Sequence, residues 1–334
     1  MADEENIRDK TKGMEQAAVT EAYSRQATRV LLISLAGMLV TAAVQAVICV
    51  YSGSVALLAD TIHNFGDALT SIPLWIAFVL CKRPPSKRFT YGLGRTEDLA
   101  GLFIVAVILA SAGVAGYQSI QRLAHPAEQT HLGVTAAAAL IGFIGNEIVA
   151  GYRIRMGRKL GSAALVADGQ HARMDGITSL AVIAGVAGSW LGYPILDPIV
   201  GLGITVMILF IAKDTAKLVF TRMLDGIEPE TVERITQTAG RIPGVRAVSE
   251  VKARWSGHEI KMELSISVDT ELTVRDAHRI AQEVNHELLH EIEHVGSVYV
   301  HVDPVEETGP EFHTHEALDR CCPESGSLRE RLSG

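Results

Sequence analysis

The sequence contains two copies of a pattern in which histidine and aspartate stand among apolar residues. Residues 59–71 read ADTIHNFGDALTS, and residues 167–179 read ADGQHARMDGITS. Both copies follow the pattern A-D-x-x-H-x-x-x-D-x-x-T-S. A histidine and an aspartate four residues apart share one face of a helix, so each copy places an imidazole beside a carboxylate.

The chemistry that these residue types allow is metal binding. Two imidazoles and two carboxylates make a four-ligand set that suits tetrahedral Zn²⁺. A charge at the centre of a bilayer costs ~2.5–3.5 kcal/mol, so two carboxylates there need a dication. Hydrogen bonds that only fix helix packing would explain one such pair, but two identical pairs favour a function. The repeat therefore predicts a metal transport site formed by His63, Asp67, His171 and Asp175.

Each copy carries a further aspartate three residues before its histidine. These residues are Asp60 and Asp168, and in a helix both lie close to the face of the predicted ligands. We expect them either to support the ligands from behind or to line the path of the ion. A purely structural role fits the same two positions equally well.

The repeats lie in two of six apolar segments that are long enough to span a lipid bilayer, which takes about 20 residues. The chain has 334 residues, of which 48% are hydrophobic and 5% aromatic, a composition typical of membrane helices. We place the spans near residues 29–51, 54–81, 97–122, 132–152, 163–190 and 195–212. The second and fifth spans run in opposite directions, as in transporters whose inverted repeats meet near the bilayer midplane.

Lysine and arginine gather in alternate connectors between these spans. They occur before the first span, after the second and after the fourth, where the connector carries Arg153, Arg155, Arg158 and Lys159. Positively charged connectors face the cytoplasm. The sequence therefore predicts a multi-pass protein of the cell membrane with both termini in the cytoplasm.

After the last span the chain becomes charged and shows mixed helix and strand patterns. Residues 213–305 follow the order helix, strand, strand, helix, strand, which predicts a ferredoxin-like fold. The predicted fold class is an α-helical membrane protein with six transmembrane helices and a C-terminal α+β ferredoxin-like cytoplasmic domain. Its predicted parts are a cytoplasmic tail at 1–25, a transmembrane domain at 26–212, the ferredoxin-like domain at 213–305 and a disordered tail at 306–334.

Other features of the sequence argue against several function classes. A net charge of −8 does not fit a partner made of nucleic acid. Residues 286–290 spell HELLH, as in zinc peptidases, but a peptidase also needs a third ligand and a cleft. We expect these histidines to lie on a solvated helix face and the protein not to be an enzyme. The alternative for this motif is weak metal sensing together with His294.

The tail carries His313, His315, Cys321 and Cys322. It is expected to be an ordinary polar tail, with metal capture as the alternative.

Over roughly residues 25–305 the sequence resembles the cation diffusion facilitator family. The resemblance is carried by H-x-x-x-D in the second and fifth spans, GSVALLAD at 53–60, YGLGRTEDLAG at 91–101 and HVDP at 301–304. It implies a homodimeric exporter of divalent metal ions that uses H⁺ as the counter-ion. The histidine and aspartate set resembles that of zinc exporters, so Zn²⁺ is the expected ion, with Cd²⁺, Co²⁺, Ni²⁺ and Fe²⁺ left open.

The resemblance also implies features of the soluble domain. A metal site of family members matches His278, His301 and Asp303, whereas two further ligand positions of that site fall on Ser249 and Ser265. A cation and an anion that join the bundle to the soluble domain in family members match Arg95 and Asp225. The rival to an exporter is a membrane-anchored metal sensor or zinc metallopeptidase that uses the soluble-domain histidines.

Overall fold

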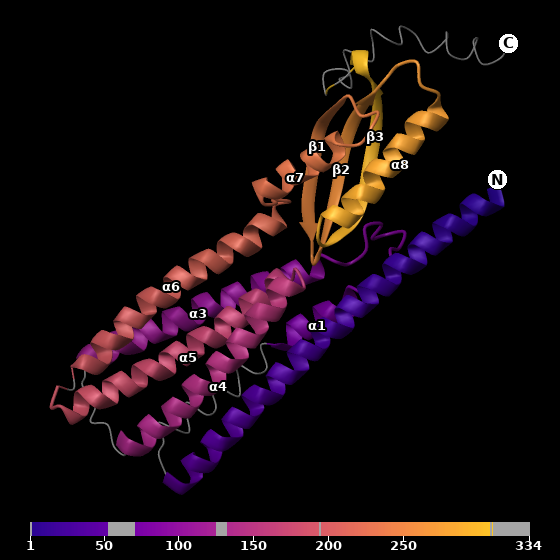
Figure 1. Ribbon diagram of the computed structural model, residues 1–334. Helices are drawn as coiled ribbons and strands as arrows, with labels where there is room; N and C mark the ends of the chain where they lie inside the picture. The colour runs from indigo at the N-terminus through magenta and orange to yellow at the C-terminus, as the bar shows by residue number, and fades with distance from the viewer. Residues whose placement is uncertain (1, 53–70, 125–131, 194, 308, 310–334) are drawn as a thin grey trace. The chain divides into compact units, whose positions relative to one another are not determined.

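The computed structural model describes residues 2–52, 71–124, 132–193, 195–307 and 309 (Figure 1). The chain divides into two compact units, Met1–Leu224 and Asp225–Gly334, and each has its own core. The first unit is helical, and the second contains a small sheet. The tail predicted at 306–334 lies outside the described residues, apart from residues 306, 307 and 309.

The helical unit is built from long apolar helices. Its helices are α1 (Ala2–Ser52), α3 (Thr96–Ala124), α4 (Leu132–Lys159), α5 (Ala163–Trp190) and α6 (Leu196–Met223), with a shorter apolar helix at Ser71–Leu80. In the part of the chain that the structure describes, four stretches are long and apolar enough to cross a membrane. They are Ala18–Ile48, Thr96–Ala124, Gly133–Lys159 and Pro198–Met223. The predicted second span, at 54–81, is described only from Ser71 onward.

Helix α5 differs from these four because its first half carries Asp168, His171, Arg173 and Asp175. These side chains lower its hydropathy, although the helix is as long as its neighbours. It packs against α3, α4 and α6, while α1 packs against α4 (Figure 1). Apolar residues of α5 such as Leu165 and Met174 belong to the main core of the unit. Asp168, His171 and Asp175 are therefore buried among the neighbouring helices, whereas Arg173 is partly exposed.

Glycines allow α4 and α5 to approach each other closely. A Cβ atom added to Gly169 of α5 would lie 2.9 Å from the backbone nitrogen of Ile154 and 3.0 Å from Cβ of Arg153. A Cβ atom added to Gly157 of α4 would lie 2.9 Å from the backbone nitrogen of Val166. Such distances leave no room for a side chain at either glycine.

The end of the helical unit differs from the predicted boundary at residue 212, which lies inside α6. The helix continues to Met223. The reason is that buried residues recur at helical spacing past the expected end, at Ile208, Ala212, Thr215 and Val219. Residues 213–224 therefore belong to the helical unit and not to the soluble domain.

The second unit has the predicted order of helices and strands. Its elements are α7 (Pro229–Gly240), β1 (Ala247–Ser256), β2 (Glu259–Val268), α8 (Val274–Glu291), β3 (Val295–Pro304) and a short 3₁₀ helix (Val305–Glu307). The sheet order is β1-β2-β3, with β1 antiparallel and β3 parallel to β2. The helices contact each other, and residues such as Ile235, Val284 and Leu288 pack with Met262 and Ile266 of β2. One face of the sheet is thus covered by both helices.

Candidate metal site

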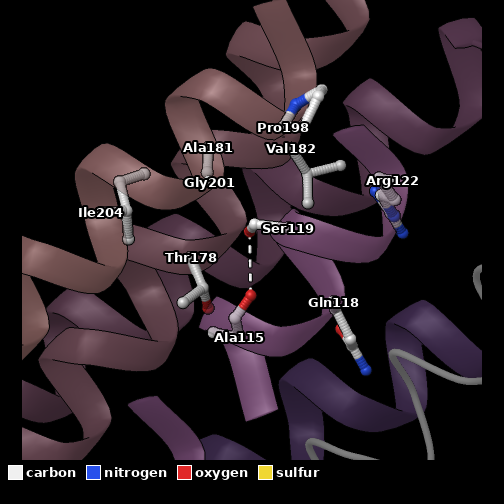
Figure 2. A pocket seen from close by; sticks show the side chains of 10 residues that line it. All are labelled: Ala115, Gln118, Ser119, Arg122, Thr178, Ala181, Val182, Pro198, Gly201 and Ile204. Carbon is white, nitrogen blue, oxygen red and sulfur yellow. Dashed lines mark hydrogen bonds between the residues drawn. The ribbon is translucent and has the colours of Figure 1, made fainter. Parts of the chain in front are cut away.

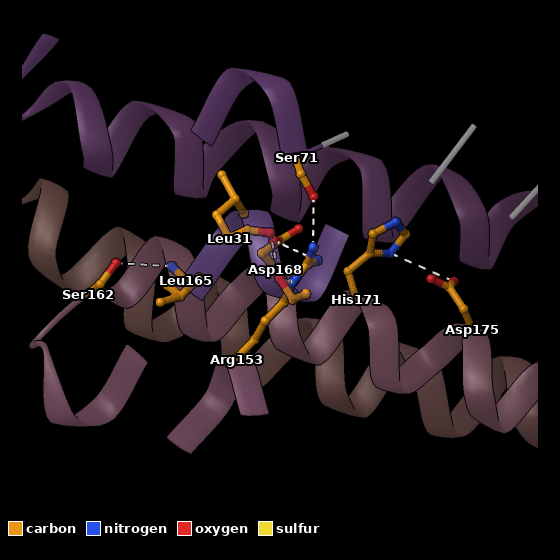
Figure 3. A network of polar contacts seen from close by, with 9 residues as sticks. Leu31, Ser71, Arg153, Ser162, Leu165, Asp168, His171 and Asp175 are labelled. Atoms are coloured by element: carbon orange, nitrogen blue, oxygen red, sulfur yellow. Dashed lines mark hydrogen bonds and ion pairs between the residues drawn. The ribbon is translucent and has the colours of Figure 1, made fainter. Parts of the chain in front are cut away.

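The second copy of the repeated pattern is buried on α5. The side chains of His171 and Asp175 are 2% and 6% exposed. Their Nδ1 and Oδ1 atoms lie 3.9 Å apart, one turn along the helix (Figure 3). The predicted ligands from the first copy, His63 and Asp67, lie outside the described residues, as does Asp60. The structure therefore describes half of the predicted ligand set.

The threonine and serine that end the repeated pattern bond to the backbone of its last aspartate. The hydroxyl groups of Thr178 and Ser179 donate hydrogen bonds of 2.8 Å and 3.1 Å to the carbonyl oxygen of Asp175. Hydroxyl side chains commonly bond a carbonyl one turn earlier in a helix. This arrangement satisfies their polarity inside the bundle and leaves the Asp175 carboxylate for other interactions.

Asp168 forms a buried ion pair with Arg153 of α4. The two side chains are 0% and 1% exposed, and Oδ2 lies 2.7 Å from Nη1 (Figure 3). The remaining nitrogens of the guanidinium are also used, since Nε donates to the hydroxyl of Ser34 at 2.8 Å and Nη2 to that of Ser71 at 3.0 Å. One arginine thus connects α1, the helix at Ser71–Leu80, α4 and α5.

The prediction that Arg153 lies in a connector between two spans was wrong. Helix α4 continues to Lys159, and the guanidinium is directed into the bundle because Asp168 offers it a carboxylate. A signal for this pair was present in the sequence. Arg153 and Asp168 lie at similar distances along the chain from the turn at Leu160–Ser162, so an α4–α5 hairpin brings them level.

A second ion pair occupies a more exposed face of the same helices. Arg173 of α5 donates to both carboxylate oxygens of Glu147 of α4, at 2.7 Å and 3.2 Å. The side chains are 34% and 42% exposed. Arg173 lies between His171 and Asp175 in the sequence. Its side chain is on another face of α5, where Glu147 neutralises its charge.

A small cavity lies next to the predicted site. It has a volume of about 140 Å³, is partly open, and is lined by residues of α3, α5 and α6 (Figure 2). Its wall includes Thr178, one turn past Asp175, together with Ser119 and Arg122 of α3. Ser119 donates a hydrogen bond of 2.8 Å to the carbonyl of Ala115 within its own helix. The pocket therefore offers space for water molecules beside Thr178, one turn of α5 beyond Asp175.

Among the residues that the structure describes, no group of three or more histidine, cysteine, aspartate or glutamate side chains could hold a metal ion. In the helical unit this finding agrees with the position of two predicted ligands outside the described residues. His171 and Asp175 alone supply one nitrogen and one carboxylate. A complete four-ligand site at α5 stays a prediction.

The predicted site of the soluble domain is assembled in part. His301 and Asp303 of β3 lie together, with Nε2 and Oδ1 2.9 Å apart, and the side chains are 60% and 5% exposed. Ser265 is the register partner of His301 on β2. His278 of α8 lies 3.0 Å from the amide of Gln282, and it forms no three-residue ligand group with the β3 pair in the described chain. The soluble metal site stays a prediction.

The remaining predicted residues have partners within their own units. Arg95 donates to the carbonyl oxygen of Met223 at 3.2 Å in the helical unit. Asp225 forms an ion pair with Arg254 at 3.4 Å in the other unit. The predicted link between Arg95 and Asp225 joins separate units and stays a prediction. The HELLH histidines, His286 and His290, lie exposed on α8 with ring centroids 4.5 Å apart, as expected of a solvated helix face.

Two family models match the chain. A model described as the cation efflux transmembrane domain matches residues 31–224, and the match ends where the helical unit ends. A model described as the cytoplasmic domain of the cation efflux protein matches residues 227–305. Together the two models cover both units.

Individual proteins are similar over most of the chain. The probable cation efflux system protein Rv2025c of Mycobacterium tuberculosis is 52% identical over 278 residues, which cover 83% of this chain and 84% of that protein. The magnetosome protein MamB of Magnetospirillum gryphiswaldense is 27% identical over 254 residues, or 76% of this chain and 86% of that one. A solved nickel form of a MamM CTD variant shares 34% identity over 23% of this chain and 98% of its own, with a TM-score of 0.23.

Proposed function

The chain belongs to the cation efflux family, and we propose that it exports Zn²⁺ from the cytoplasm in exchange for protons. Family membership makes it a membrane transporter of divalent metal ions and not an enzyme. The choice of Zn²⁺ as the ion and the exchange for protons are the two parts that we propose beyond family membership.

The observation that carries the proposal is the buried pair on α5. His171 and Asp175 are enclosed in a helix bundle, within 3.9 Å of each other, and the same spacing recurs at His63 and Asp67. Ionisable groups inside a membrane helix bundle are costly and mark ion pathways. We assign the four side chains to one transport site, with His171 and Asp175 contributed by α5.

The ligand types favour Zn²⁺ over harder ions. Zn²⁺ is bound tetrahedrally by imidazole nitrogen and carboxylate oxygen, whereas sites for Mg²⁺ and Mn²⁺ use mainly oxygen. Co²⁺, Ni²⁺, Cd²⁺ and Fe²⁺ also accept imidazole, so they are competing cargo ions. Imidazole binds a metal only in its neutral form, and the arrival of protons therefore releases the ion.

The proposed topology has six spans with both termini in the cytoplasm of a cell-membrane protein. Four of the spans are supported by the length and composition of described helices, and α5 by its length and burial. The match of residues 227–305 to the cytoplasmic domain of cation efflux proteins supports a cytoplasmic sheet unit that takes part in homodimerisation. A membrane-anchored metal sensor is the second candidate, supported by the His301–Asp303 pair.

The deciding experiment is Zn²⁺ flux into proteoliposomes that contain the purified chain. We expect the wild type to fill the vesicles and Asp175→Ala to lose about 100-fold or more of the rate, because one of four ligands is gone. Asp214→Ala, at an exposed aspartate of α6, is the matched control and should keep the wild-type rate. A sensor would give no flux with any of these chains, and wild-type flux from Asp175→Ala would remove Asp175 from the site.

A further inference from the structure

We propose that Arg153 and Asp168 form a charge-balancing pair that sets the affinity of the transport site for its cation. The inference rests on the proposed function, because it takes His171 and Asp175 to bind the metal. It starts from a rare feature, a guanidinium and a carboxylate that are 1% and 0% exposed inside a membrane bundle. Figure 3 shows this pair on the same side of α5 as the two proposed ligands.

The distance along α5 makes the pair an electrostatic neighbour of the site. Asp168, His171 and Asp175 follow the spacing i, i+3, i+7 and therefore share one helix face. Side chains three residues apart have Cβ atoms about 5–6 Å from each other. Charges at this separation interact strongly where water is excluded. A bare guanidinium here would repel an incoming dication, and a bare carboxylate would attract it.

The positive charge of the pair is permanent and fixed in place. Arginine keeps its proton under all conditions in a protein. Its guanidinium is held by Asp168 at 2.7 Å, by Ser34 at 2.8 Å and by Ser71 at 3.0 Å, so the fork cannot swing away. Asp168 consequently neutralises a charge that no change of pH or rotamer removes. With both present, the pair adds no net charge beside the ligands, and losing either partner changes the affinity for the metal.

Other cations near α5 are directed elsewhere. Arg173 pairs with Glu147 on a half-exposed face, where solvent screens the charge. The buried Arg222 of α6 donates to the carbonyl oxygen of Gly161, in the turn before α5 begins. Arg122 of α3, which lines the nearby pocket, is exposed to solvent. Among the described residues, Arg153 is therefore the buried arginine that pairs with a residue on the face of the proposed ligands.

A purely structural role for the pair makes different predictions. If Arg153 only ties four helices together, then removing either partner weakens the bundle and should impair metal binding in the same direction. If the pair balances charge, the two single substitutions should shift the affinity in opposite directions, and removing both charges should restore it. Lysine at position 153 separates the two roles further, because it keeps the charge and loses the planar fork.

The test is the half-saturating Zn²⁺ concentration for flux into proteoliposomes, together with Zn²⁺ binding by calorimetry on the full-length dimer. We expect Asp168→Asn to raise this concentration about tenfold and Arg153→Gln to lower it by a similar factor. Arg153→Gln with Asp168→Asn should return within about threefold of the wild type, and Arg153→Lys should stay close to it. Arg155→Gln, an exposed arginine of the same helix, should change nothing.

Shifts in the same direction from the two single variants, or an Arg153→Lys chain that behaves like Arg153→Gln, would overturn the proposal. Should one single variant fail to fold, the direction of the affinity shift in the other single variant and in Arg153→Lys decides, since a purely structural role predicts weaker binding from each of them. Failure of the proposed function would look different. In that case Asp175→Ala would keep its Zn²⁺ flux, whatever the behaviour of the Arg153 variants.

Discussion

Single residues in the first half of α5 show how a membrane helix carries polar groups. Asp168 meets the guanidinium of Arg153, and His171 lies beside Asp175. Even the hydroxyl groups of Thr178 and Ser179 bond to a carbonyl oxygen of their own helix. The ion pair and the hydroxyl bonds offset part of the cost of leaving water. His171 and Asp175 are the two residues whose types match a metal, and we propose them as ligands of the cargo ion.

The type of ligand at position 171 should decide which ion is moved. We expect His171→Asp to lower the ratio of Zn²⁺ flux to Mn²⁺ flux about tenfold, because a hard oxygen replaces a borderline nitrogen. The measurement is metal-by-metal uptake into proteoliposomes. His290→Asp, the same exchange at an exposed position of α8, serves as the control. An unchanged ratio in His171→Asp would show that this imidazole does not touch the ion.

At the scale of elements, periodicity and pattern predicted a large part of the fold. The order α7, β1, β2, α8, β3 followed from alternating and helical apolar spacing in residues 213–305. Burial of His171 and Asp175 followed from the duplicated motif. The burial of Arg153 was not predicted, because a cation near the end of a membrane helix is usually an anchor on the cytoplasmic side. Its burial depends on Asp168 of another helix, and a pattern along one helix carries no such information.

The close contact between α4 and α5 holds the ion pair of Arg153 and Asp168 in place. It depends on glycines, since any Cβ at Gly169 would press on the backbone of Ile154 and on Cβ of Arg153. Gly151 of α4, by contrast, has nothing within 4 Å of an added Cβ. The two glycines therefore make a matched pair for experiment.

We expect Gly169→Ala to destabilise the bundle by about 1–3 kcal/mol, as overpacking of a close interface does. Alanine is the better helix former by about 1 kcal/mol, so a loss can only come from the interface. The loss of stability is measured by thermal unfolding of the detergent-solubilised protein. The control Gly151→Ala should unfold at or above the wild-type temperature. Equal stability of the two variants would mean that α4 and α5 are not packed this closely.

At the scale of the whole molecule, the chain combines a helical unit that carries the proposed transport site with a small sheet unit. The two matching family models divide at the same place in the sequence. A buried site on α5 can deliver an ion across a membrane only if it opens to one side at a time. Transport in one direction therefore needs an energy source that acts on the site itself.

Protons are the source that the ligands suggest, because a proton and a metal ion compete for the same imidazole nitrogen. With vesicles acidic inside and the membrane potential clamped by K⁺ and valinomycin, we expect Zn²⁺ to accumulate inside while the internal pH rises. Dyes for Zn²⁺ and for pH report the two fluxes in one sample.

Adding nigericin, which collapses the pH gradient, should reduce Zn²⁺ entry to downhill exchange. Vesicles that contain Asp175→Ala serve as the control, because they measure the background leak of Zn²⁺ and H⁺ without transport. Zn²⁺ accumulation that persists after the gradient has collapsed, at the same external Zn²⁺ concentration, would rule out proton exchange and leave the site with another driving ion.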